Sequence, residues 1–123
     1  MHTRWERKMQ EVSVVIKKLY HISFPVSDLK RTAAFYEKIL GLKKIGEWPT
    51  YVEFDVGGVQ FGFKPGGESE IFLLVDNVDK AYRELKAKGV KFLSEPKDRH
   101  WGARAATLVD PDGNKFTIET FKK

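Results

Sequence analysis

The sequence predicts an α+β fold of two tandem βαβββ modules, which form a curved mixed sheet around a cup and carry their helices on the outer face. Two observations lead to this prediction. The pattern of apolar residues that begins near Ile22 returns near Ile71, and each copy continues through an amphipathic helical stretch into two alternating stretches joined by a tight turn. The chain of 123 residues has no cysteine and is long enough to bury a core without disulfides.

The first strand of each module is predicted by the repeat itself. Residues 21–29 align with residues 70–78 at an offset of 49 positions. In both segments apolar residues alternate with others, as they do in a strand that buries one face. The coincident apolar pairs are Ile22 with Ile71, Phe24 with Leu73, Val26 with Val75, and Leu29 with Val78.

A helix is predicted after each of these strands, over residues 29–40 and 78–88. Apolar residues recur in both stretches at the spacing of one helix face. Both stretches are also flanked by residues that favour helix ends. These residues are Asp28 and Asn77 at the N-termini and Gly41 and Gly89 at the C-termini.

The remaining strands of each module are predicted by alternation and by turn residues. A short extended piece follows each helix, and a hairpin follows that piece. We interpret Asp110-Pro-Asp-Gly113 as the second hairpin turn, because proline and glycine supply the backbone angles of a turn. The predicted stretches are 43–47, 51–56 and 59–64 in the first module, and 91–94, 105–109 and 115–120 in the second.

The domain organisation follows from these boundaries. We expect an N-terminal extension over residues 1–16 and a single domain over 17–123, with modules at about 17–65 and 68–121. Within the extension, a short amphipathic helix and a frayed tail are both compatible with the sequence. The helix would present Trp5, Met9 and Val12 on one face.

The distribution of charge excludes some classes of partner. The chain has 22 basic and 17 acidic residues, a formal net charge of +5. The excess is at the two ends, and residues 19–121 carry equal numbers of each sign, so we expect no nucleic-acid partner. There is no apolar run of membrane-spanning length and no signal-peptide core, so we expect a cytoplasmic protein without a membrane partner.

The alternation of the strands also predicts which side chains line the cup. Ile22 and Phe24 are expected in the core, so their neighbour His21 faces the other way. The same reasoning places Phe61 and Phe63 in the core. Side chains expected on the cup face are His21, Gln60, Lys64, Glu70, Phe72, Thr117 and Glu119, with Gly62 among them.

The repeat and its motifs resemble the vicinal oxygen chelate superfamily, over about residues 17–121. This superfamily includes glyoxalase I, bleomycin resistance proteins, extradiol dioxygenases, fosfomycin resistance thiol transferases and methylmalonyl-CoA epimerases. One scaffold thus supports enzymes of several classes and non-catalytic binding proteins. The motifs that carry the resemblance are His21-Ile-Ser-Phe-Pro-Val-Ser-Asp-Leu29, Phe35-Tyr-Glu-Lys-Ile-Leu-Gly-Leu42, Trp101-Gly-Ala-Arg104 and Asp110-Pro-Asp-Gly-Asn114.

The resemblance implies a metal site at four positions, and the residues there depart from the family pattern. His21 matches, and Glu70 replaces an expected histidine with an oxygen ligand. Gly62 has no side chain, and Thr117 is a poor ligand where a glutamate is usual. Glu119 lies two residues beyond Thr117 and Gln60 two before Gly62. We therefore predict a divalent metal (Fe, Mn, Ni or Zn) held by His21, Glu70 and Glu119, with Gln60 as an alternative third ligand.

Non-metal interpretations of the same residues remain open. His21 is equally consistent with an ordinary half-buried histidine. Glu70 is as well placed for an ion pair with Lys64 or Lys115 as for a metal. Trp48 and Trp101 lie on connecting segments and are candidates for apolar walls over a ligand.

Two functions follow from the resemblance. The first is a metal-dependent lyase, isomerase or dioxygenase, in which Glu70 or Glu119 acts as the catalytic proton-transfer group. The alternative is a metal-free protein of the bleomycin-resistance type that sequesters a small molecule in the cup. We expect a homodimer in either case. Residues expected to contact the ligand are Gln60, Lys64, Phe72, Trp48, Trp101 and Thr117.

Overall fold

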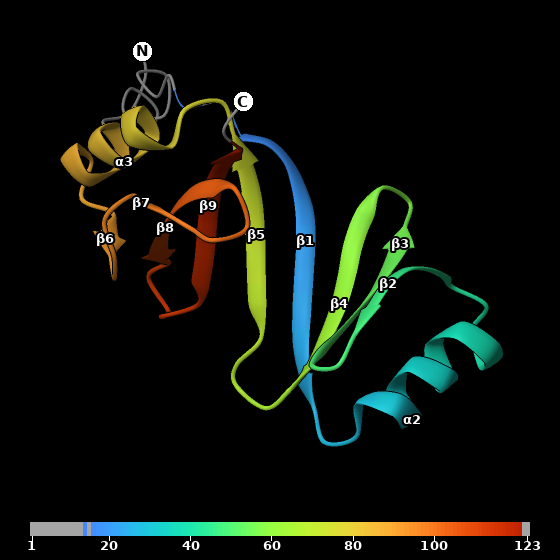
Figure 1. Ribbon diagram of the computed structural model, residues 1–123. Helices are drawn as coiled ribbons and strands as arrows, with labels where there is room; N and C mark the ends of the chain where they lie inside the picture. The colour runs from blue at the N-terminus through green and yellow to red at the C-terminus, as the bar shows by residue number, and fades with distance from the viewer. Residues whose placement is uncertain (1–13, 15, 122–123) are drawn as a thin grey trace, which may run out of the picture. The chain divides into compact units, whose positions relative to one another are not determined.

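The computed structural model describes residue 14 and residues 16–121, so the predicted helix of Trp5, Met9 and Val12 lies outside the described residues. The predicted strands and helices occur in the predicted order, with an additional short strand over Lys97–Asp98, and the α+β class is confirmed (Figure 1). None of the helices in the described ranges is long and apolar enough to cross a membrane. The elements are β1 (Ile16–Val26), α2 (Leu29–Ala34), the π-helical turn η1 (Phe35–Ile39), β2 (Lys43–Trp48), β3 (Tyr51–Val56), β4 (Val59–Pro65), β5 (Glu70–Val75), α3 (Val78–Ala87), β6 (Lys91–Phe92), β7 (Lys97–Asp98), β8 (Ala103–Val109) and β9 (Lys115–Phe121).

The chain divides into two compact units. The first unit comprises residues 19–72, and the second comprises residues 73–121 together with the described residues up to Lys18. The division falls inside β5, after Phe72, whereas the sequence suggested a boundary before this strand. The start of β5, with Glu70 and Phe72, therefore belongs to the first unit.

In the first unit the strands are ordered β2-β3-β4-β1. Strand β1 runs parallel to β4, while β2 with β3 and β3 with β4 are antiparallel, which makes the sheet mixed. The core lies under α2 and is mostly aromatic, because Phe24, Tyr36 and Phe61 pack around the buried rings of Phe54 and Phe63. The predicted placement of Phe61 and Phe63 in the core is confirmed.

In the second unit the order is β5-β9-β8-β6, with the short β7 also paired to β8. Strands β8 and β9 are antiparallel. The buried residues of the core under α3 are all aliphatic, and the partly buried rings of Tyr82 and Phe92 pack against them. These buried residues are Val75, Val78, Ala81, Ala106 and Ile118.

The predicted helix caps are confirmed in both units. Asp28 accepts a hydrogen bond from the backbone of Arg31 at 3.1 Å, and Asn77 accepts one from Lys80 at 3.0 Å. Gly41 and Gly89 follow the helices with φ angles of 72° and 93°, a conformation that side chains with a Cβ disfavour. The stretch from Leu29 does not stay α-helical to its end, because α2 passes into η1 at Phe35.

The Asp110 turn is structural, as predicted. The carboxylate of Asp110 accepts hydrogen bonds from the backbone nitrogens of Asp112 and Asn114 and from the Asn114 side chain. These bonds hold the pKa of the Asp110 carboxyl below its ordinary value. Both oxygens of Asp110 are thus used in closing the hairpin.

Candidate functional site

The face of the first unit's sheet opposite α2 carries polar and aromatic side chains. Strand alternation places them there: Phe61 and Phe63 point to the core, so Gly62 and Lys64 lie on the other face. The parallel register of β1 and β4 sets His21 beside Gln60 and Ser23 beside Gly62. We refer to this surface as the polar face of the first unit. It includes His21, Tyr51, Glu53, Gly62, Lys64, Glu70 and Phe72.

His21 is packed between rings and is largely withdrawn from water. Its imidazole stacks on Phe72, with 4.9 Å between ring centroids, and meets Tyr20 edge-on at 6.1 Å. Burial lowers the pKa of His21 below its ordinary value; the negative charge of Glu70 raises this pKa, and the positive charge of Lys64 lowers it further. The histidine is therefore neutral at pH 7.

The ring nitrogen Nε2 of His21 is hydrogen-bonded to the hydroxyl of Tyr51. The carboxylate of Glu53 lies 3.8 Å from the same nitrogen, and Tyr51 also hydrogen-bonds to Glu53. A phenol has one proton, so both bonds form when Nε2–H of His21 donates to Tyr51 and Tyr51 donates to Glu53. Burial, followed by the charge of Glu53, raises the pKa of Tyr51 well above its ordinary value, so the phenol keeps its proton.

Gly62 explains why Tyr51 reaches His21. A Cβ placed on Gly62 would lie 1.8 Å from the Tyr51 hydroxyl oxygen and 2.4 Å from the ring carbon that bears it. Such distances are far inside van der Waals contact. The tyrosine side chain therefore occupies the space that any side chain at position 62 would need.

Glu70 forms an ion pair with Lys64 on the same face. This arrangement confirms the alternative in which Glu70 pairs with a lysine. The pair is partly open to water, since the side chains of Lys64 and Glu70 are 22% and 45% exposed. Its contribution to stability is small for that reason, but it fixes the position of both side chains.

Glu119 lies in the second unit and is fully buried. The indole nitrogen of Trp101 donates a hydrogen bond to Glu119 Oε1 at 2.8 Å, while Oε2 has no partner among the described residues. Burial raises the pKa of Glu119 to about 7, so half of the carboxyl groups are protonated near neutral pH. Thr117, two residues before it, shares a hydrogen bond of 3.2 Å with Thr107.

The residues at the implied metal positions do not fit a metal ion. Nε2 of His21 is bonded to Tyr51, Glu70 is paired with Lys64, Gly62 has no donor, and Thr117 is bonded to Thr107. Among the residues that the structure describes, no three His, Cys, Asp or Glu side chains form a group that could hold a metal. A metal bound through Nε2 of His21 and Oε1 of Glu70 would have to displace both existing interactions.

The structure brings some predicted site residues together and leaves others apart. His21, Lys64, Glu70 and Phe72 share the polar face of the first unit, and Trp48 lies beside Tyr51 at 6.0 Å between ring centroids. Gln60 adjoins His21 through the strand register. The predicted site residues that lie in the second unit are Trp101, Thr117 and Glu119.

Sequence reasoning missed Tyr51 and Glu53. Their signal is present, because Val52 and Phe54 are fully buried and alternation turns residues 51 and 53 to the opposite face. The strand was predicted correctly, but none of its residues was predicted as a site residue. A tyrosine two residues from a glutamate on a sheet face carries no metal-ligand pattern.

Comparisons with known proteins identify the family of the chain. A family model described as the glyoxalase/bleomycin resistance protein/dioxygenase superfamily matches residues 18–69 and again residues 64–118. The two overlapping matches correspond to the two copies of the internal repeat. Together they cover most of the chain.

Individual relatives agree with the family model. The chain is 35% identical to the uncharacterized protein YraH of Bacillus subtilis, over 82% of this chain and 96% of that protein. It is 26% identical to the metallothiol transferase FosB of Lysinibacillus sphaericus, over 87% of this chain and 84% of that protein.

Among solved structures, the Mn(II)-bound glyoxalase of Novosphingobium aromaticivorans superposes with a TM-score of 0.69 at 23% identity, covering 87% of this chain and 40% of that one. At this identity the likeness shows the fold alone. The duplicated family match, which covers residues 18–118, shows the family: the chain belongs to the glyoxalase/bleomycin resistance protein/dioxygenase superfamily.

Proposed function

We propose that the protein binds a small molecule on the polar face of the first unit without a metal ion, as a ligand-sequestering member of its superfamily. One observation carries the proposal: the Tyr51 hydroxyl is bonded to His21 Nε2 and occupies the space of a side chain at position 62. The imidazole nitrogen that would bind a metal already has a partner. Direct contact between protein and ligand is the remaining way to use this face.

The chemistry of the face favours a flat, aromatic ligand. A row of rings runs from Trp48 to Tyr51, to His21 and to Phe72, with centroid separations of 6.0, 6.1 and 4.9 Å. Trp48 is 52% exposed and open to stacking. Aromatic rings gain about 0.5–1.5 kcal/mol per pair beyond the burial of their area. The Lys64–Glu70 pair supplies polar groups at the edge of the row.

The first test is the response of the melting temperature to metals. Saturating Mn²⁺, Ni²⁺, Zn²⁺ or anaerobic Fe²⁺ should not raise it, since a ligand raises the melting temperature only by binding the folded state more tightly than the unfolded state. His21→Ala should respond to the metals in the same way as the wild type. A rise of several degrees with one metal, abolished by His21→Ala but retained by the exposed control His100→Ala, would refute the metal-free proposal.

The second test is direct binding. Flat aromatic fragments should shift the backbone amide resonances of His21, Tyr51 and Phe72 in two-dimensional NMR spectra, and saturated analogues of equal size should not. Tyr51→Phe keeps the ring and removes the hydroxyl, so it should weaken binding only for fragments that carry hydrogen-bonding groups. Equal shifts from saturated and aromatic fragments would contradict a stacking site.

A second candidate function, proton transfer, is favoured by Glu119. This carboxyl is buried, has an oxygen without a partner among the described residues, and has a pKa of about 7, which suits a general acid or base at neutral pH. If the protein is an isomerase or lyase, Glu119 is the proton carrier. The test uses a panel of α-substituted carbonyl compounds in D₂O. NMR detects whether the protein exchanges the proton next to the carbonyl for deuterium. Glu119→Gln should abolish any exchange, and a panel without exchange would argue against catalysis.

A further inference from the structure

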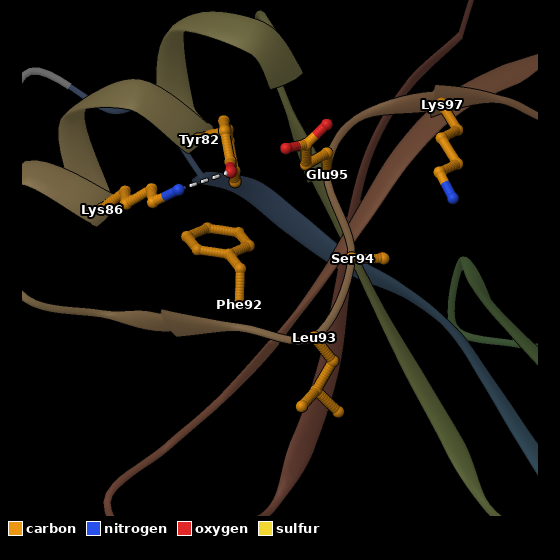
Figure 2. Close-up of a pocket in the computed structure, with 7 residues that line it drawn as sticks. All are labelled: Tyr82, Lys86, Phe92, Leu93, Ser94, Glu95 and Lys97. Carbon is orange, nitrogen blue, oxygen red and sulfur yellow. Dashed lines mark hydrogen bonds between the residues drawn. The ribbon is translucent and has the colours of Figure 1, made fainter.

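The second unit contains a cavity, but its side chains do not converge on a ligand. The cavity has a volume of about 380 Å³ and lies between α3 and the segment from β6 to β7 (Figure 2). Its two rings, Tyr82 and Phe92, meet edge to face with 4.6 Å between their centroids, so they pack on each other. Figure 2 shows the side chain of Lys97 directed away from that of Lys86. The rings of the first unit are arranged differently, in a row whose outer end, Trp48, is 52% exposed.

Trp48 lies on the polar face of the first unit because β2 contains one extra residue. The register of β2 against β3 shifts by one residue between Lys44 and Gly46. An extra residue in one strand turns the side chains that follow it to the other face of the sheet. After the shift, Gly46 is opposite Glu53 and Trp48 is opposite Tyr51. Directly opposite residues share a face, so the bulge brings both Gly46 and Trp48 to the side of the sheet that carries Tyr51 and Glu53.

The indole of Trp48 occupies the space that a side chain at position 46 would need. A Cβ placed on Gly46 would lie 3.2 Å from Cζ2 of the indole, 2.5 Å from Cζ3 and closer still to Cη2. These separations are well below the 3.5–4.0 Å at which carbon atoms pack. Gly46 is not among the described glycines with a positive φ. Space for the indole, and not backbone conformation, therefore accounts for glycine at this position.

Two glycines thus flank Glu53 across the sheet. The strand register sets Gly46 on β2 and Gly62 on β4 opposite this carboxylate on β3. The indole of Trp48 takes the space over one glycine, and the hydroxyl of Tyr51 takes the space over the other. Both rings of this end of the row are therefore seated on neighbouring backbone. The exposed Trp48 has a defined position although the core does not enclose it.

We propose that Gly46 is a positioning residue of the ligand-binding face, a role that rests on the proposed function. By leaving room for the indole, Gly46 holds Trp48 in line with Tyr51 before a ligand arrives. A ring that is already in place loses less conformational freedom on binding, and this raises the affinity for a flat partner. The preference of the face for flat rings then depends on a residue that acts only through its neighbour Trp48.

The position of the indole can be tested without a ligand. One of the two Hα protons of Gly46 points toward the indole, so the ring current should separate the two Hα resonances of this glycine. Trp48→Ala removes the ring and should bring the two resonances closer together. If the resonances were unchanged in Trp48→Ala, the indole would not lie over Gly46 and the proposal would be overturned.

The probe for the binding role is 2-naphthol, with decahydro-2-naphthol as its saturated control. In titrations of the full chain followed by the amide resonances of Tyr51 and Phe72, Gly46→Ala and Trp48→Ala should each weaken 2-naphthol binding about threefold to tenfold. This factor corresponds to the loss of one aromatic contact. The saturated compound should lose less. The matched control is Glu47→Ala, which alters the opposite face of β2 between the two positions and should leave the affinity unchanged.

A double variant shows whether Gly46 acts through Trp48. Gly46→Ala added to Trp48→Ala should cause no further loss of affinity for 2-naphthol. A further loss as large as that in the wild-type background would overturn the proposal, and so would an unchanged affinity in Gly46→Ala alone. If the wild type bound neither compound, the proposed function would fail and the binding role of Gly46 with it. Separated Hα resonances would in that case still establish the position of the indole.

Discussion

The two units follow the same repeated pattern but solve the same packing problem with different side chains. The core of the first unit is a cluster of aromatic rings, with Tyr36 stacked on Phe63 at 4.4 Å between centroids. The buried side chains of the second core are aliphatic, among them Ala81, Ala106 and Ile118, and its two rings, Tyr82 and Phe92, are only partly buried. The repeat therefore preserves the positions that are apolar and not their size.

The two units also carry different polar groups at corresponding places on their strands. In the first unit Tyr51 bonds to a neutral histidine, and in the second Trp101 bonds to a buried carboxyl, Glu119. In both, an aromatic side chain with a polar tip holds the group that sequence reasoning assigned to a metal. The difference teaches that the fold tolerates exchange of these side chains, so membership of the family does not determine the chemistry of this face.

The largest expected effect is on the aromatic core. Phe63 is 2% exposed, so Phe63→Ala should reduce the free energy of unfolding by about 3–5 kcal/mol, measured by urea denaturation. Ile118→Val in the second unit removes one methyl group and should cost only about 0.5–1.5 kcal/mol. Equal losses would show that the two cores are less different than their rings suggest.

Glu119 should make stability depend on pH in the second unit. Its pKa of about 7 in the folded chain exceeds the ordinary value, so the folded state holds its proton more tightly than the unfolded state. The protonated Glu119 carboxyl therefore contributes to the free energy of unfolding below about pH 4.5, and this contribution is lost as the pH rises toward 7. Between pH 4.5 and pH 8, the free energy of unfolding of Glu119→Gln should rise by about 1–3 kcal/mol relative to that of the wild type. Parallel pH curves for the two proteins would exclude a raised pKa.

The helix caps should be more alike in the two units than the cores. Asp28→Ala and Asn77→Ala each remove one side-chain acceptor from a helix N-terminus and should each cost about 0.5–2 kcal/mol. Replacing each residue by Ser should restore most of the loss. If Asp28→Ala alone had no effect on stability, the shorter helix α2 would be held by its packing on the sheet and not by its N-terminal cap.

The smallest expected effect is on the titration of His21, followed by the NMR resonances of its ring. Its pKa should lie below 6.5, and the stability that this provides should be lost as the pH falls below 6.5. Glu70→Gln should lower this pKa further and Lys64→Gln should raise it, because the two charges act in opposite directions. A pKa above 6.5 would indicate that Glu70, and not burial, dominates.

Much of the fold could be predicted because it depends on local patterns. Alternation located the strands, and Asp28 and Asn77 marked the helix starts, since a cap needs only its own side chain and the next turn. The change from α2 to η1 at Phe35 could not be predicted, because it depends on how the stretch packs on the sheet.

The candidate site was predictable only in part. The polar side of the strands follows from alternation, and the Lys64–Glu70 pair was one of the alternatives that the sequence left open. The role of Tyr51 could not be predicted, because its hydroxyl crosses from β3 over Gly62 on β4 to His21 on β1. A contact that spans three strands depends on the tertiary arrangement and leaves no spacing in the sequence.

The contact between Tyr51 and Gly62 also constrains how this protein can evolve. A single mutation that gives position 62 a side chain collides with the tyrosine, and a single mutation that removes the tyrosine leaves His21 without its partner. A lineage that moves between metal-free and metal-binding forms must therefore change both position 51 and position 62. The intermediate sequence has neither the Tyr51–His21 hydrogen bond nor a metal ligand at position 62. Among homologues, glycine at 62 and tyrosine at 51 should be inherited together, as one character and not two.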